Sequence, residues 1–133
     1  MTAHEFTGAV GDWLAIARKD WGRIFIMLGK EDLEAAAVFL EQSLEKYLKA
    51  FLLSRGWTLR KLHELDTLLD DAVAHRSGLE NFRNLCERVS GYYLADRYPP
   101  LSPLGLFRGD LEKDLMEARQ FIIALFPEEH LRP

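Results

Sequence analysis

The segment from Asp32 to Gly56 repeats its apolar residues at intervals of three and four positions, and it constrains the fold more than any other part of the sequence. This spacing places apolar side chains on one face of an α-helix. Asp32 is suited to cap the first free amides. The apolar face consists of Leu33, Ala36, Ala37, Leu40, Leu44, Tyr47, Leu48, Phe51 and Leu52. We therefore predict a helix of about two dozen residues, roughly 35 Å long.

The same spacing predicts four more helices. Gly29 can adopt the left-handed conformation and is expected to end the first of them. Pro99 and Pro100 are expected to end the helix before them, because proline cannot continue the hydrogen-bond ladder. Asp110 is expected to cap the last helix. The predicted ranges are Val10–Leu28, His63–Ala74, Leu79–Tyr93 and Asp110–Leu125, with a break at Ser77 and Gly78.

Helices with one wide apolar stripe must bury that stripe against each other. No strand pattern or internal repeat competes with the helical pattern. We therefore predict an all-α fold, an antiparallel up-and-down four-helix bundle with an additional short helix. At 133 residues the chain is long enough to bury a core without disulfides or metals, and we expect a single domain over residues 1–133.

Composition and charge exclude several classes of protein. The formal net charge of −4 weighs against broad, sequence-independent binding to nucleic acid, which requires many cations. The longest apolar runs, "IFIML" and "AAAVFL", are too short to span a bilayer, so no membrane association is expected. No export signal is recognisable, which favours a cytoplasmic protein. The single Cys86 agrees and is expected to be a small buried hydrophobe.

Motifs for the common enzyme chemistries do not occur. The sequence has no glycine-rich phosphate loop, no Gly-x-Ser-x-Gly elbow and no paired cysteines for zinc. His63, Asp66 and Asp70 share one helix face and could supply metal ligands. The simpler interpretation is a histidine near a helix start with two solvated acids. We therefore predict no metal and no cofactor.

Charged residues near the central helix suggest two interpretations. Glu45 and Lys49 form a favourable i, i+4 pair beside the apolar stripe, either as surface decoration or at the border of an interface or groove. The following loop could form a positive rim for an anionic ligand if the bundle brings it near Arg97. The alternative is a solvated basic loop. The loop residues concerned are Arg55, Arg60, Lys61 and His63.

Aromatic residues also have two interpretations. Trp13 and Trp21 are expected in the core or on a dimer surface rather than in a cofactor site. Tyr92, Tyr93 and Tyr98 could stack on a base, but tyrosines on a packed helix are usually core residues with a polar tip.

Three segments occur in order along the chain: "FLEQSLEKYLKAFLLSRG", "LHELDTLL" and "YYLADRYPP". Together they resemble the HEPN domain family (higher eukaryotes and prokaryotes nucleotide-binding). Glu45-Lys46 and Lys49-Ala50 resemble steps of the family's central helix. His63 with Leu65 resembles its histidine-leucine step, and Arg97-Tyr98-Pro99 resembles its helix end.

The resemblance implies an up-and-down helical bundle that forms a homodimer, and a minimal nucleotidyltransferase as partner in a toxin-antitoxin-like pair. Active members of the family are metal-independent RNases with an arginine and, after four to six residues, a histidine. The arginine would stabilise charge on the phosphate and the histidine would move a proton. For this chain the resemblance implies nucleotide-binding candidates at Lys49, His63, Arg97 and Tyr98.

The RNase motif is incomplete in this sequence. Counting from Arg97, the positions where the histidine should fall hold Ser102, Pro103 and Leu104. None of these side chains can act as that acid or base. A non-catalytic HEPN protein that binds a nucleotide, RNA or the nucleotidyltransferase is the first hypothesis. The alternatives are an RNase using Arg97 with His63, and a structural or regulatory homodimer in which Arg97 caps helix carbonyls.

Overall fold

In the computed structural model, the backbone is described for residues 3–58, 64–97 and 107–131, and the side chains for residues 9–58, 64–92 and 107–131. These residues form five α-helices and one 3₁₀-helix, η1, and contain no strand. The predicted all-α class is confirmed. The elements are α1 (Ala3–Gly29), α2 (Leu33–Ser54), α3 (Leu65–His75), η1 (Ser77–Phe82), α4 (Arg83–Arg97) and α5 (Arg108–Leu125).

The junction between α1 and α2 confirms one predicted cap and corrects another. The Asp32 side chain accepts a hydrogen bond from the Ala35 amide at 3.1 Å, so Asp32 caps α2 as expected. Gly29 ends α1, but it is not the left-handed residue. That conformation belongs to Glu31, which has a φ of 58°. The turn therefore places a non-glycine residue in a region that L residues rarely adopt.

In the second half of the chain, two helices begin at residues other than those predicted. The expected break at Ser77 and Gly78 is a 3₁₀-helix, so α4 begins at Arg83 rather than at Leu79. The prediction that Asp110 caps the last helix is wrong, because α5 begins at Arg108. Phe107 occupies the N-cap position and makes no side-chain cap bond. Asp110 instead lies in the first turn, where its charge interacts favourably with the helix dipole.

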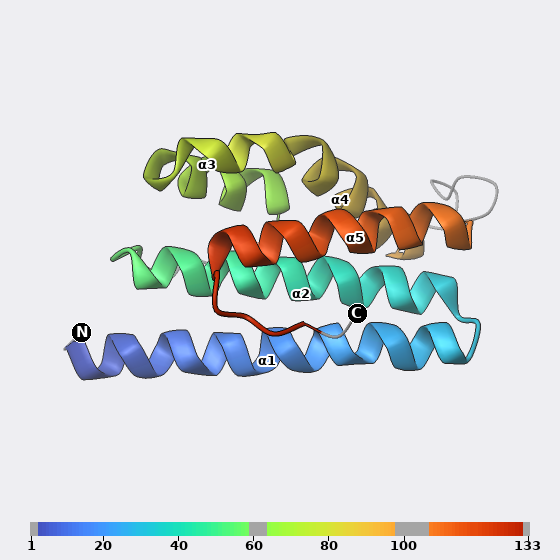
Figure 1. The fold of residues 1–133 in the computed structure, drawn as a ribbon, viewed down its shortest axis with the longest axis horizontal. Coiled ribbons are helices and arrows are strands. Elements are labelled where there is room, and N and C mark those ends of the chain that lie inside the picture. Colours follow the sequence, from blue (N-terminus) through green and yellow to red (C-terminus); the bar gives the residue numbers. More distant parts are fainter. Residues whose placement is uncertain (1–2, 59–63, 98–106, 132–133) are drawn as a thin grey trace.

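Helix α2 is the shared partner of the other α-helices. The backbones of α1, α3, α4 and α5 all lie close to it, and α1 makes its most extensive contacts there. Figure 1 shows α1 and α2 side by side and antiparallel, with α5 on α2 and with α3 and α4 farther from α1. The four-helix up-and-down arrangement is not confirmed by these contacts and stays a prediction.

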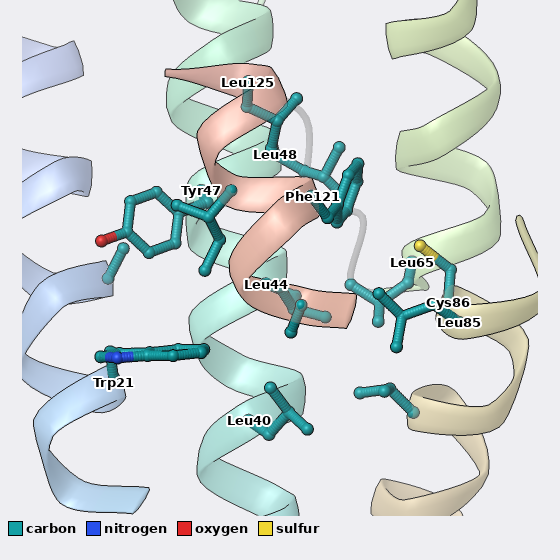
Figure 2. Packing of buried hydrophobic residues seen from close by; sticks show 14 of the residues in the cluster. Trp21, Leu40, Leu44, Tyr47, Leu48, Leu65, Leu85, Cys86, Phe121 and Leu125 are labelled. Atoms are coloured by element: carbon teal, nitrogen blue, oxygen red, sulfur yellow. The ribbon is translucent and has the colours of Figure 1, made fainter. Parts of the chain in front are cut away.

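The core lies around α2. Leu44 and Leu48 are fully buried and belong to a cluster with side chains from the four other α-helices. Figure 2 shows Trp21 of α1, Leu65 of α3, Cys86 of α4 and Phe121 of α5 in this cluster. Full burial of one such aliphatic side chain stabilises the fold by about 1.5–3 kcal/mol. The burial of α2 against the other four α-helices thus explains the length of its apolar stripe.

Cys86 is fully buried in this core, as predicted. Burial raises the pKa of its thiol to about 12, because the thiolate would lose its hydration. The group is therefore a packed hydrophobe rather than a nucleophile. In the described part of the chain, no helix combines the length and apolar character needed to cross a membrane.

Candidate functional site

Five charged residues gather along α2 and the facing part of α1. We call this group the charged seam: Asp20 of α1 with Glu41, Glu45, Lys46 and Lys49 of α2. Asp20 is fully buried, and Glu41 and Lys49 are only 5% and 3% exposed. Charged side chains are rarely buried to this extent unless they are paired. The seam is therefore the most unusual electrostatic feature of the described residues.

Asp20 joins the two helices of the seam. Its carboxylate accepts hydrogen bonds from Lys46 of α2 and from Arg23 of α1, the latter at 2.7 Å. The Ser43 hydroxyl donates to the carbonyl of Ala17 at 2.9 Å nearby. The α1–α2 contact therefore contains polar bonds within an otherwise apolar interface.

Lys49 lies inside the seam rather than on an exposed flank. Its ammonium contacts Glu45 Oε2 at 3.0 Å and lies 5.1 Å from the centre of the Trp13 ring. The i, i+4 pair predicted with Glu45 is confirmed, and it is buried rather than surface decoration. A cation enclosed by a carboxylate and an indole face can offer a charge-assisted bond to an anion only when its cover moves.

Glu41 is the acid of the seam with the most altered titration. Burial, followed by repulsion from Glu45, raises the pKa of its carboxyl from 4.5 to about 8. Glu41 is therefore mostly protonated at neutral pH. Strongly shifted groups of this kind concentrate at functional sites, which is one reason to treat the seam as a candidate site.

A second cluster fastens α1 to the end of the chain. Residues 126–131 form an irregular segment after α5, which we call the C-terminal strap, and Figure 1 shows it running back toward α1. Glu129 of the strap accepts a hydrogen bond from Arg18 Nη2 of α1 at 2.6 Å. It also accepts one from the Tyr47 hydroxyl of α2 at 2.7 Å. We call these three residues the clamp.

The clamp favours an ionised Glu129. Burial alone would raise the pKa of this carboxyl, but the hydrogen bonds from Arg18 and Tyr47 outweigh burial and lower it. The pKa of the Tyr47 hydroxyl is raised by burial and by its bond to Glu129, so Tyr47 remains a donor at any ordinary pH.

A third cluster connects α4 with α5. The buried carboxylate of Asp114 accepts hydrogen bonds from Arg88 at 3.1 Å and from the Tyr92 hydroxyl. Tyr92 packs against the core with its hydroxyl satisfied, so the prediction of a core tyrosine with a polar tip is confirmed for this residue. These bonds fix the part of α4 that leads to Arg97.

The predicted site residues are described to different extents. Arg97 is the last residue of α4, and its side chain lies outside the described residues, as do His63 and Tyr98 and the loop residues Arg60 and Lys61. Figure 1 shows the end of α4 near the start of α5, whereas Lys49 lies on the half of α2 nearer Ser54. The backbone therefore does not bring Lys49 and Arg97 together. Arg55 is exposed, with its guanidinium 5.2 Å from the centre of the Phe51 ring.

The acids considered for a metal site have other partners. Arg83 contacts Asp70 at 2.7 Å and Asp66 at 3.6 Å, while His63 lies outside the described residues. Within the described ranges, no three His, Cys, Asp or Glu side chains are placed to hold a metal ion.

The sequence contains an indication of the charged seam that the helix periodicity alone did not reveal. Asp20 lies three residues after Ala17 and four before Ile24, which places a charge inside the apolar stripe of α1. Glu41 interrupts the stripe of α2 in the same way, between Ala37 and Leu44. A charge at a core position of a helix indicates a buried pair or a functional group. The Arg18–Glu129 contact had no such signal, because the two residues are far apart in the sequence.

Comparison with known proteins gives a match to one family of domains. Searches of curated proteins and of solved structures gave no match to this chain. The model of the HEPN domain matches residues 10–127, which span α1 from Val10 onward, all the other helices and the start of the C-terminal strap. The chain therefore belongs to the HEPN domain family, a family of nucleotide- and RNA-binding domains.

Proposed function

We propose that this chain is a non-catalytic HEPN-domain protein that binds a nucleotide or RNA through Arg97. The proposal rests on one combined observation. The chain matches the HEPN family, and the residues that follow Arg97 lack the histidine of the RNase motif. Arg97 ends α4, and Ser102, Pro103 and Leu104 stand where the RNase histidine would be. A guanidinium can bind a phosphate in a bidentate manner without any proton transfer.

Three other predicted residues belong to the proposal with different roles. Tyr98 and His63 are candidates to contact the base or the ribose of the ligand. Lys49 is a candidate for a phosphate, but its burial means that it can contribute only after a rearrangement. The proposed protein is a cytoplasmic homodimer and has a minimal nucleotidyltransferase as partner.

Nucleotide binding is tested by titrating the purified protein with ATP, AMP and a short single-stranded RNA in a calorimeter. Arg97→Ala should weaken binding about tenfold or more, since a hydrogen bond to a charged group contributes about 1.5–3 kcal/mol. Lys113→Ala is the matched control. It removes one positive charge from an exposed position of α5 and should leave the affinity unchanged. No binding by the wild type, or equal affinities of both variants, would contradict the proposal.

The alternatives give different results. An RNase using Arg97 with His63 would cleave the same RNA, and Arg97→Ala would abolish the cleavage. A structural homodimer would bind none of these ligands, and Arg97→Ala would lower only its melting temperature. A pull-down with the product of a neighbouring nucleotidyltransferase gene tests the protein partner.

A further inference from the structure

Of the four nucleotide-binding candidates, only Lys49 has its side chain among the described residues, and it is inaccessible. Its ammonium is enclosed by Glu45 of its own helix and by the Trp13 ring of α1. Lys46, three residues earlier on α2, is held by Asp20 of α1 and retains 20% exposure of its side chain. Each lysine is thus neutralised by a carboxylate where an anionic ligand would otherwise bind.

The cover over Lys49 comes from the less buried half of α1. Among residues 9–18 only Ala17 is buried, whereas Trp21, Ile24 and Leu28 are all buried farther along the helix. Local opening begins in segments with few buried apolar contacts. The N-terminal half of α1 therefore separates from α2 more easily than the half that carries Trp21.

The clamp lies at the border between these halves. Arg18 donates to Glu129 through Nη2 at 2.6 Å and through Nε at 3.1 Å, and Tyr47 holds the same carboxylate from α2. Other contacts of α1 outside α2 lie at its buried half, where Arg119 approaches the Trp21 ring and Arg108 approaches the Leu28 carbonyl. The clamp is thus placed to hold the first half of α1 against α2.

We propose that residues 9–18 of α1 form a lid over Lys49, that the clamp holds this lid closed, and that a nucleotide phosphate binds Lys49 and Lys46 when the lid opens. The inference rests on the proposed function, because that function supplies the anionic ligand. Opening removes the Trp13 ring from Lys49 and lets water or phosphate reach it. Lys46 is already 20% exposed and stays paired with Asp20, which lies outside the lid.

The charge of the opened seam favours an anion. Glu41 is mostly protonated at neutral pH and contributes little negative charge. Three cations are then present, namely the two lysines of the seam and the neighbouring Arg23. Their partners in the seam are two carboxylates, those of Asp20 and Glu45. While Glu41 keeps the proton that its burial in the closed protein favours, these cations outnumber the two carboxylates by one, which favours the entry of a phosphate.

A first experiment measures the lid without any ligand. Hydrogen exchange of the full chain is followed by mass spectrometry in the wild type and in Glu129→Gln. The matched control is Glu117→Gln, which removes a carboxylate that pairs with Arg88 at 3.1 Å on the exposed side of α5. Glu129→Gln should accelerate exchange in residues 9–18 and leave α3 and α4 unchanged, and Glu117→Gln should leave residues 9–18 unchanged. Equal exchange of residues 9–18 in all three proteins overturns the lid.

A second experiment links the lid to the ligand. Ala17 and Ser43 lie in contact across α1 and α2, and both are fully buried. Ala17→Cys with Ser43→Cys is therefore oxidised during refolding to fix the closed state. ATP should bind Glu129→Gln about threefold or more tightly than the wild type, because more of the protein is open. The oxidised double variant should bind at least about tenfold more weakly than its own reduced form.

The outcomes separate the two proposals. Nucleotide binding that is unchanged by the cross-link overturns the lid and leaves the proposed function standing. A wild type that binds neither nucleotide nor RNA overturns the proposed function, and the phosphate role of Lys49 with it. The double variant also carries Cys86→Ser, so that no third thiol takes part in the oxidation.

Discussion

Glu41 and Glu45 lie one helical turn apart on α2, and both carboxyl groups are withdrawn from water. Glu45 is ion-paired with Lys49, whereas Glu41 keeps its proton at neutral pH. The two acids therefore share one environment and differ in charge. This difference makes the stability of the protein depend on pH.

Glu41→Gln should reduce that dependence. The folded protein holds the Glu41 proton up to about pH 8, while the unfolded chain releases it above about 4.5. Unfolding between these values therefore releases a proton, and raising the pH lowers the free energy of unfolding by up to about 1.4 kcal/mol per pH unit. Urea denaturation from pH 5 to 8 measures the slope, which Glu41→Gln should flatten and the exposed control Glu128→Gln should not. A slope shared by all three proteins would contradict the assignment.

The clamp should behave as one cooperative unit. Tyr47→Phe removes a hydrogen bond that contributes about 0.5–3 kcal/mol, since the acceptor is charged. Glu129→Ala removes the acceptor of this bond and the ion pair with Arg18 as well. The double variant should lose less stability than the sum of the two single losses, because both changes remove the same contact. Chemical denaturation of the four proteins checks this, and strict additivity would show that the contact contributes nothing.

Leu44→Ala should destabilise the protein by about 2–5 kcal/mol. Leu44 is fully buried at the centre of α2, and its loss leaves a cavity among side chains of several helices. Ile123→Ala on α5 is the control, since Ile123 is 41% exposed and should change stability only slightly. Similar losses in both variants would mean that the core is not centred on α2.

Asp114→Asn should loosen the attachment of α4 to α5. The change weakens the bonds from Arg88 and Tyr92 and should lower stability by about 1–3 kcal/mol. Glu117→Gln, which breaks a more exposed contact of the same Arg88, should stay within about 0.5 kcal/mol of the wild type. Thermal unfolding distinguishes the two, and the expectation fails if their melting temperatures shift equally.

Cys86 should resist thiol reagents in the folded protein. Burial both hides the sulfur and raises the pKa of the thiol to about 12, so the thiolate fraction at ordinary pH is very small. Labelling with a thiol-reactive dye should be slow without denaturant and complete within minutes in urea. Rapid labelling of the native protein would place Cys86 outside the core.

The sequence predicted the start of α2 well, because a capping residue directly precedes its apolar stripe. The start of α2 was confirmed by the Asp32 cap, whereas the starts of α1 and α4 were misplaced. Residues 3–9 carry two weak helix formers, Thr7 and Gly8, which hide the first turns of α1. The 3₁₀-helix at Ser77–Phe82 could not be separated from α4, because both carry apolar residues at similar intervals.

The candidate site was less predictable because burial depends on which helices meet. Periodicity correctly places Lys49 beside the apolar stripe of α2, but it cannot tell that α1 covers this side and encloses the ammonium under Trp13. The family resemblance pointed to Arg97 and was confirmed at the level of the family. The roles of Lys49, His63, Arg97 and Tyr98 in binding a ligand stay predictions.

The position of Glu129 has a practical consequence for where this domain is taken to end. The family match stops at residue 127, two residues before the carboxylate that fastens the strap to α1. A chain trimmed to residues 10–127 would keep every predicted core helix and lose this fastening. Its first helix should then melt before the rest, so we expect the physical boundary of the domain to lie beyond the boundary that sequence similarity draws.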